Sequence, residues 1–167
     1  MYSNLETFFT DADHAVNDFN AWSKRHLPQA AADHICYKCD NTAEFEQLRK
    51  LFEADSTFIY QSIISKRRIA IIRFTKPLVT DLGDVWLLEL SDQKPDGSQM
   101  SGFDHFEIYP TTGPLENLAQ DLITKGVDLE KIERPHHTTF DGQITPSLKI
   151  RLEPEPLLVK IKAEEMV

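Results

Sequence analysis

The residues best suited to chemistry are two Asp-His pairs, which occur in matching contexts in the two halves of the chain. Asp33-His34-Ile35 recurs as Asp104-His105-Phe106, each at the start of an alternating, strand-like stretch. Neutral imidazoles joined by a carboxylate are ligands for Zn²⁺, Fe²⁺, Mn²⁺ or Ni²⁺. A single histidine in such a stretch more often has a structural role than a metal-binding one. The repetition instead favours a divalent metal site built from both halves.

Strand periodicity places further polar residues on the face that carries the two histidines. Because successive side chains alternate between the faces of a strand, Ile35 and Phe106 lie on the face opposite His34 and His105. A sheet face made of polar side chains is hard to explain unless it lines a cleft. We expect the concave face of a curved sheet to hold His34, Arg73, Glu89, His105, Glu107, Tyr109, Arg151 and Glu153.

Four of these side chains are candidates for roles other than metal binding. Glu107 and Tyr109 are the candidates for proton transfer in catalysis. Arg73 and Arg151 are candidates for holding an anionic substrate through paired hydrogen bonds. Salt bridges from the two arginines to carboxylates on the same face are the equal alternative.

Two other polar pairs have less specific interpretations. Asp33 and Asp104 each precede a histidine, and adjacent strand residues point to opposite faces, so we do not expect either aspartate to support its own neighbour. His136-His137 is expected in a loop near the rim of the concave face, with metal binding as the less favoured alternative.

Composition restricts the class of protein. The chain has 167 residues, 41% of them hydrophobic and 27% charged, which suits one globular domain. A net charge of −9 disfavours nucleic acid and anionic membranes as partners, and Lys66-Arg67-Arg68 is one short basic candidate. The absence of a signal-peptide pattern or a long apolar run predicts a cytoplasmic protein.

The two cysteines, Cys36 and Cys39, form a CxxC motif that a redox pair or half of a zinc site can also show. The motif lies inside an alternating stretch, which directs the two sulfurs to opposite faces of a strand. We therefore interpret them as two ordinary strand cysteines rather than as a reactive pair.

The order of elements predicts a duplicated unit. A helix is expected over residues 3–25, with Ser3 as its N-cap and a possible break near Thr10-Asp11. Strands are expected at 32–39, 57–64, 69–74 and 85–90, with a helix after Asn41-Thr42. The second half repeats the order, with strands at 103–109, 148–152 and 157–161 and a helix opened by Gly113-Pro114.

These elements predict an α+β fold of two paired βαβββ modules that form a curved mixed sheet, a cup with the helices outside. We divide the chain into an N-terminal helical arm (1–30), a first module (31–92), a linker loop (93–102) and a second module (103–167), together one globular domain. One module alone has an apolar face that it cannot bury, so two are needed.

Several segments together resemble the vicinal oxygen chelate superfamily of glyoxalase I, extradiol dioxygenases and bleomycin-resistance proteins, and more closely the small bacterial YecM-like group. These segments are Asp33-His34-Ile35, the 86–90 stretch with the following 92–95, residues 102–108, and residues 134–141 with 150–153. The resemblance spans about residues 30–165.

The resemblance implies a cup around a divalent metal, with ligands from the first and last strands of each module. His34 and His105 match the first strands, and Glu89 matches the last strand of the first module. In the second module Lys160 stands where a carboxylate is expected, which leaves Glu153 as its substitute. The expected metal ligands are therefore His34, His105, Glu153 and Glu89.

Three functions fit these expectations. The first is a metal-dependent isomerase, lyase or dioxygenase that acts on a small oxygenated molecule. The second is a non-catalytic module that binds and sequesters a small-molecule ligand, and the third is an interaction domain in which the histidines are remnants. The chain is expected to be a monomer or a homodimer.

Overall fold

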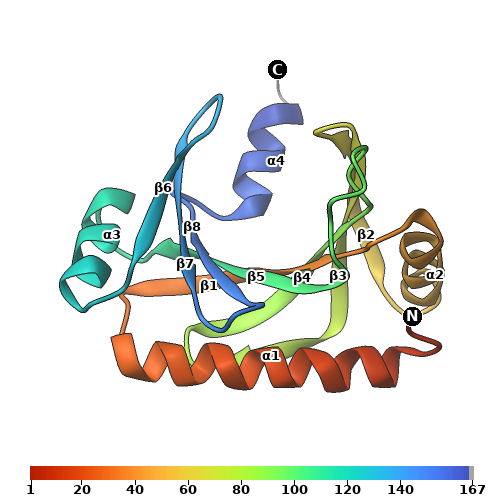
Figure 1. The fold of residues 1–167 in the computed structure, drawn as a ribbon, viewed down its shortest axis with the longest axis horizontal. Helices are drawn as coiled ribbons and strands as arrows, with labels where there is room; N and C mark the ends of the chain where they lie inside the picture. Colours follow the sequence, from red (N-terminus) through yellow and green to blue (C-terminus); the bar gives the residue numbers. More distant parts are fainter. Residues whose placement is uncertain (166–167) are drawn as a thin grey trace.

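The computed structural model describes residues 1–165, and its elements follow one another as four helices and eight strands in that range (Figure 1). Their bounds are α1 Leu5–His26, β1 Ala30–Lys38, α2 Thr42–Glu53, β2 Thr57–Ile64, β3 Arg67–Thr80, β4 Gly83–Ser91, β5 Gly102–Pro110, α3 Leu115–Thr124, β6 Leu129–Glu133, β7 Thr138–Gln143, β8 Lys149–Leu152 and α4 Leu157–Glu165. None of the helices in this range is both long and apolar enough to cross a membrane.

The strands form one mixed sheet in the order β2-β3-β4-β1-β5-β8-β7-β6. The two first strands, β1 and β5, pair antiparallel at its centre, and each pairs in parallel with the last strand of its own half, β4 or β8. Figure 1 shows the sheet bent into a U, with α1 along its base and α2 and α3 at its sides. The predicted α+β fold of two βαβββ modules in a curved sheet is confirmed.

The convex face of the sheet carries the main core. Ile35 and Phe106, the apolar neighbours of the two histidines, are fully buried there. Phe19 of α1 stacks on Phe106 with 4.3 Å between the ring centroids. Burying a large aromatic side chain stabilises the fold by roughly 1.5–3 kcal/mol, so α1 is an integral layer of the core.

Helix α1 differs from the sequence expectation at its start. Its N-cap is Asn4, whose side chain accepts a hydrogen bond from the Thr7 amide, instead of Ser3. The helix also continues through the expected break at Thr10-Asp11, because Phe8 and Ala12 on either side are fully buried against the sheet. It ends at His26, and its C-cap, Leu27, adopts a left-handed conformation before Pro28.

The strand expected at residues 157–161 is wrong, because this segment is the start of α4. Pro156 fixes the entry to the helix, and its carbonyl accepts hydrogen bonds from the Val159 and Lys160 amides. Leu157 and Ile161, one helical turn apart, both pack on an apolar cluster of β3 and β4. The expectation of helices outside the sheet therefore holds for α1 to α3, while α4 lies in the mouth of the U (Figure 1).

Candidate metal centre

The register of the two central strands brings the histidines together. In the antiparallel ladder of β1 and β5, His34 pairs with Glu107, and Cys36 pairs with His105. Alternation then places all four side chains on the concave face. His34 and His105, which are far apart in the sequence, are buried with 6.2 Å between their ring centroids.

Each central strand has an irregularity immediately before its histidine. The register of the β1–β5 ladder skips Asp33 in β1 and Asp104 in β5, so each aspartate is the extra residue of a β-bulge. A bulge interrupts the alternation of side chains between the two faces. Both aspartates can therefore reach the histidine beside them, and the expectation that they face away is wrong.

Each aspartate holds one nitrogen of its histidine. The Nδ1–H of His34 donates to Asp33 Oδ2, and the Nδ1–H of His105 donates to Asp104 Oδ2, both at 2.7 Å. A carboxylate on Nδ1 fixes the tautomer, so that Nε2 of each neutral ring carries the lone pair. Strand periodicity alone did not predict this orienting role of Asp33 and Asp104, although the repeated Asp-His pairs were the signal for it.

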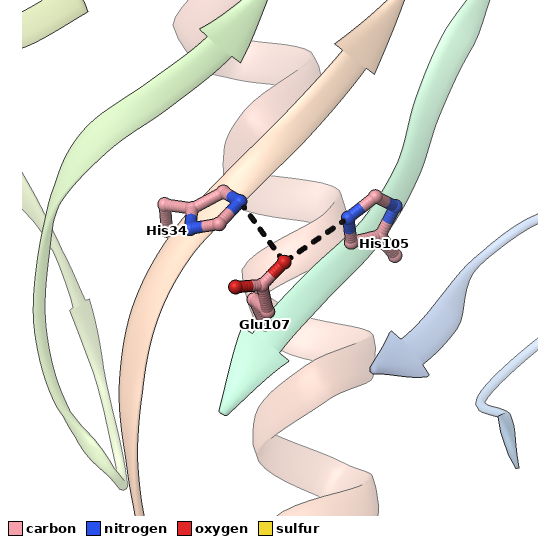
Figure 2. Close-up of side chains that lie close together, drawn as sticks. All are labelled: His34, His105 and Glu107. Atoms are coloured by element: carbon pink, nitrogen blue, oxygen red, sulfur yellow. Dashed lines mark ion pairs between the residues drawn. The ribbon is translucent and has the colours of Figure 1, made fainter. Parts of the chain in front are cut away.

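The two Nε2 atoms point toward one carboxylate oxygen (Figure 2). Glu107 Oε2 is 3.5 Å from Nε2 of His34 and 3.9 Å from Nε2 of His105. One ligand atom from each of the three residues lies within 4.8 Å of the others. Among residues 1–165, neither Nε2 atom has a hydrogen-bond partner, although both are buried.

The electrostatics of the centre favour a cation at Nε2 of His34. Burial lowers the pKa of His34, but Glu107, Asp33 and Glu89 outweigh it and raise this pKa to about 10. Burial and the nearby Arg151 instead lower the pKa of His105. The negative potential that stabilises a proton on His34 also stabilises a metal cation at the same place.

Glu89 lies beside the three-residue group, on the side of β4. Its Oε2 is 3.6 Å from His34 Nε2, and its Oε1 accepts a hydrogen bond from the Cys36 thiol at 3.5 Å. Burial raises the pKa of Glu89, but His34 and other cationic neighbours hold it well below its usual range, so the carboxylate is ionised. Cys36 and Cys39 are both free and buried, on the concave face and in the main core respectively.

The second half departs from the first at the position equivalent to Glu89. Glu89 pairs with Cys36, the second residue after the first histidine, and Arg151 pairs with Glu107, the second residue after the other. Arg151 forms two hydrogen bonds of 2.8 Å with the Asp141 carboxylate, a salt-bridge partner that was not expected. The role of Arg151 in holding an anionic substrate stays a prediction. The place of a fourth ligand on the last strand is therefore held by an arginine.

Glu153 follows β8 and contacts other groups. Its Oε2 lies 3.1 Å from Lys160 Nζ and 2.9 Å from Nε2 of His137. Burial and Glu107 raise the pKa of Glu153. The structure therefore brings Glu107, expected to transfer protons, into the histidine group, and places Glu153, expected to bind metal, next to it.

The remaining candidates are peripheral. Arg73 is exposed beside the irregularity that interrupts the β3–β4 ladder between Arg73 and Leu78, with its guanidinium carbon 4.8 Å from the Trp86 ring centroid. Tyr109 lies on β5 beyond Glu107, pairs with Ala31 and is partly exposed.

The residues fit a divalent metal. Ligands bonded to zinc at about 2.0–2.2 Å stand roughly 3–3.5 Å from one another, close to the spacing of the Nε2 and Oε2 atoms here. Two buried nitrogens without hydrogen-bond partners are costly unless something else satisfies them. The two Nε2 lone pairs and the shared Glu107 oxygen are donors that suit a divalent metal, and the aspartate behind each ring orients it.

Comparisons with known proteins agree with the fold. A sequence model of the family described as YecM protein matches residues 1–163. A solved structure described as protein EC4020, from structural genomics, has a TM-score of 0.75 and 19% sequence identity, over 97% of this chain and 93% of that chain. This likeness shows a shared fold, and a shared fold does not by itself imply a shared activity.

Two further solved structures are more distant. A variant of Streptomyces coelicolor methylmalonyl-CoA epimerase in complex with 2-nitronate-propionyl-CoA has a TM-score of 0.49 and 17% identity, over 73% of this chain and 94% of that chain. A variant of the fosfomycin resistance protein FosX from Listeria monocytogenes, complexed with Mn(II) and 1S,2S-dihydroxypropylphosphonic acid, has a TM-score of 0.30 and 11% identity, over 77% and 95%. No curated protein matches the chain.

Proposed function

The chain belongs to the YecM family, and we propose that it binds one divalent metal ion, Zn²⁺, Fe²⁺, Mn²⁺ or Ni²⁺, between its two modules and uses that ion to hold a small oxygen-bearing molecule. The observation that carries the proposal is the pair of buried Nε2 atoms of His34 and His105, which have no hydrogen-bond partner among the described residues and face Glu107.

His34, His105 and Glu107 are the proposed ligands, with Glu89 as a further carboxylate at the side of His34. Three protein ligands leave coordination positions open, and a bound metal polarises the oxygen of a molecule that occupies them. Asp33 and Asp104 keep the two rings in the orientation and tautomer that this requires.

Glu153 is the carboxylate that best suits proton transfer. Its pKa is raised by burial and by Glu107, whereas that of Glu89 is held low. A group whose pKa lies closer to neutral can both accept and release a proton during a reaction. We therefore assign the acid–base role to Glu153 and propose metal-dependent isomerase, lyase or dioxygenase chemistry on a small oxygenated molecule.

A module that binds a small molecule without turnover is the second candidate. The observation in its favour is that α4 lies over the concave face, where it contacts Glu107 and Glu153. An organic ligand that raises the melting temperature of the metal-free protein would favour this candidate over catalysis.

The experiment that tests metal binding is a calorimetric titration of chelator-treated protein with Zn²⁺ and Mn²⁺. We expect one site per chain in the wild type and none in the double variant His34→Ala, His105→Ala. His14→Ala is the matched control, because His14 is exposed on α1. Equal uptake by the wild type and the double variant would contradict the assignment.

A further inference from the structure

Helix α4 occupies a different place from the other helices. Figure 1 shows α1, α2 and α3 outside the curved sheet and α4 in its open mouth. Three groups of contacts hold α4 there: an ion pair from Lys160, a hydrogen bond at its first residue and a small apolar contact. The first two involve residues of the candidate metal centre.

Lys160 extends from α4 to the third proposed ligand. Its Nζ donates a hydrogen bond to Glu107 Oε1 at 3.0 Å and lies 3.1 Å from Glu153 Oε2, with only 18% of the side chain exposed. The other oxygen of Glu107, Oε2, faces the two histidines. One carboxylate therefore joins the lysine ammonium to the place proposed for the metal.

The first turn of α4 is tied to the support of His34. The Leu157 amide donates to Asp33 Oδ2 at 3.0 Å, and the same oxygen accepts the Nδ1–H of His34 at 2.7 Å. A carboxylate at a helix N-terminus satisfies a free amide and complements the helix dipole. One oxygen of Asp33 therefore holds both the start of α4 and the His34 ring.

The apolar contact of α4 is small. Ile161 and the partly buried Leu157 and Leu158 pack on a cluster that includes Ile71 and Leu87, separate from the main core. An isolated helix shorter than about 12–15 residues is marginal in water, so this nine-residue helix depends on its docking contacts. Weakening one of these contacts should therefore release the helix.

We propose that α4 is a displaceable cover of the metal centre, in which the Lys160 ammonium pairs with Glu107 while no metal is bound, so that metal binding and α4 docking oppose each other. The inference rests on the proposed metal site. A divalent cation at Oε2 and an ammonium at Oε1 of one carboxylate repel each other at short range in a buried setting. Because coupling between two binding events is reciprocal, metal weakens the docking of α4 by the factor by which docked α4 weakens metal binding.

The test compares two lysine variants of α4. Lys160→Met removes the ammonium and keeps most of the apolar stem, and Lys162→Met is the matched control, because Lys162 is exposed on the same helix. We expect Lys160→Met to bind Zn²⁺ at least tenfold more tightly than the wild type in a calorimetric titration, and Lys162→Met to bind with wild-type affinity. If the wild type takes up no Zn²⁺ but Lys160→Met binds it tightly, that result also supports the proposal that α4 covers the centre.

A second measurement uses the wild type alone and does not depend on the folding of a variant. Hydrogen–deuterium exchange of the backbone amides at 157–161 should become faster when Zn²⁺ is added, because docking weakens. Slower or unchanged exchange on adding Zn²⁺ would overturn the proposal that α4 is a displaceable cover. A Zn²⁺ affinity of Lys160→Met equal to or below that of the wild type would overturn it too. If neither protein takes up Zn²⁺, both the proposed metal site and the proposed role of α4 are wrong. If the wild type binds Zn²⁺ and Lys160→Met binds it no more tightly, only the proposed role of α4 is wrong.

Discussion

His34 pairs with Glu107 in the ladder between β1 and β5, with Nε2 of one 3.5 Å from Oε2 of the other. The pair joins a side chain of the first module to one of the second, at the centre of the sheet. The proposed metal centre therefore forms only when β1 and β5 pair in this register, and a shift by one residue would turn the polar side chains into the apolar core.

Replacing Glu107 by Gln removes the proposed ligand charge and keeps the side-chain shape. Loss of a residue that hydrogen-bonds to a metal ligand lowers metal affinity roughly 10–100-fold. Because Glu107 is itself a proposed ligand, we expect the affinity for Zn²⁺ or Mn²⁺ to fall by more than this. Calorimetric titration of the chelator-treated protein measures this. Glu116→Gln, at an exposed position on α3, should bind as the wild type does. Because Glu107 also anchors Lys160, the same comparison is made in Lys160→Met, and unchanged affinity there would exclude Glu107 from the centre.

Replacing Asp104 by Asn tests the hydrogen bond behind His105. Asn can donate to Nδ1 instead of accepting from it, which favours the tautomer that carries its proton on Nε2. We expect metal affinity about 10–100-fold below that of the wild type, with little change in the fold seen by circular dichroism. Asp13→Asn, exposed on α1, is the control. Wild-type affinity in Asp104→Asn would mean that the ring is positioned by packing alone.

Metal affinity should depend on pH through His34. In the metal-free protein its pKa is raised to about 10, chiefly by Glu107, whereas the pKa of His105 is lowered. A histidine must be neutral to bind a metal, so between about pH 7 and 9 binding should release about one proton, from His34. Apparent affinity should rise about tenfold for each pH unit over that range and level off near the pKa. Titrations in buffers of different ionisation enthalpy count the protons, and a release near zero would contradict the account.

Replacing Phe19 by Ala tests the role of α1 in the core. The ring is fully buried and stacks on Phe106, which precedes Glu107 on β5. Large-to-small substitution of a buried phenylalanine costs roughly 3–5 kcal/mol, so urea denaturation should show a loss of that order. Asp18→Ala, at an exposed neighbouring position, should change stability by less than about 0.5 kcal/mol. A loss below about 1 kcal/mol would show that α1 is only loosely packed.

The sequence was sufficient to predict the duplicated sheet. The alternation of His34 with Ile35 and of His105 with Phe106 identified the polar and apolar faces, and both apolar residues are fully buried. Period-two patterning is a strong signal wherever one face of a strand is buried. It also predicted correctly that the two histidines, although far apart in the sequence, come together.

The bulges at Asp33 and Asp104 could not be predicted in the same way, because a bulge is a property of the pairing between two strands. Strict alternation gave the wrong direction for both aspartates and hid the hydrogen bonds behind the histidines. The choice among Glu107, Glu89 and Glu153 as ligands likewise depended on the register, which periodicity within one strand does not determine.

Helix α4 shows a different limit. Leu157, Leu158 and Val159 were interpreted as part of a strand, because the periodicity of a short apolar run does not distinguish a strand from a buried helix segment. The contact of Leu157 and Ile161 with the separate cluster on β3 and β4 decides for the helix. The turn of Lys160 toward Glu107 follows from that helix and could not be predicted without it.

The proposed metal centre holds one divalent cation between His34 and His105 on Glu107. The most direct measurement is the anomalous difference density of crystals grown with Zn²⁺, recorded on both sides of the zinc absorption edge. We expect one strong peak at about 2.0–2.2 Å from Nε2 of both histidines and from a carboxylate oxygen of Glu107. A peak elsewhere in the chain, or no peak between two ordered rings, would contradict it.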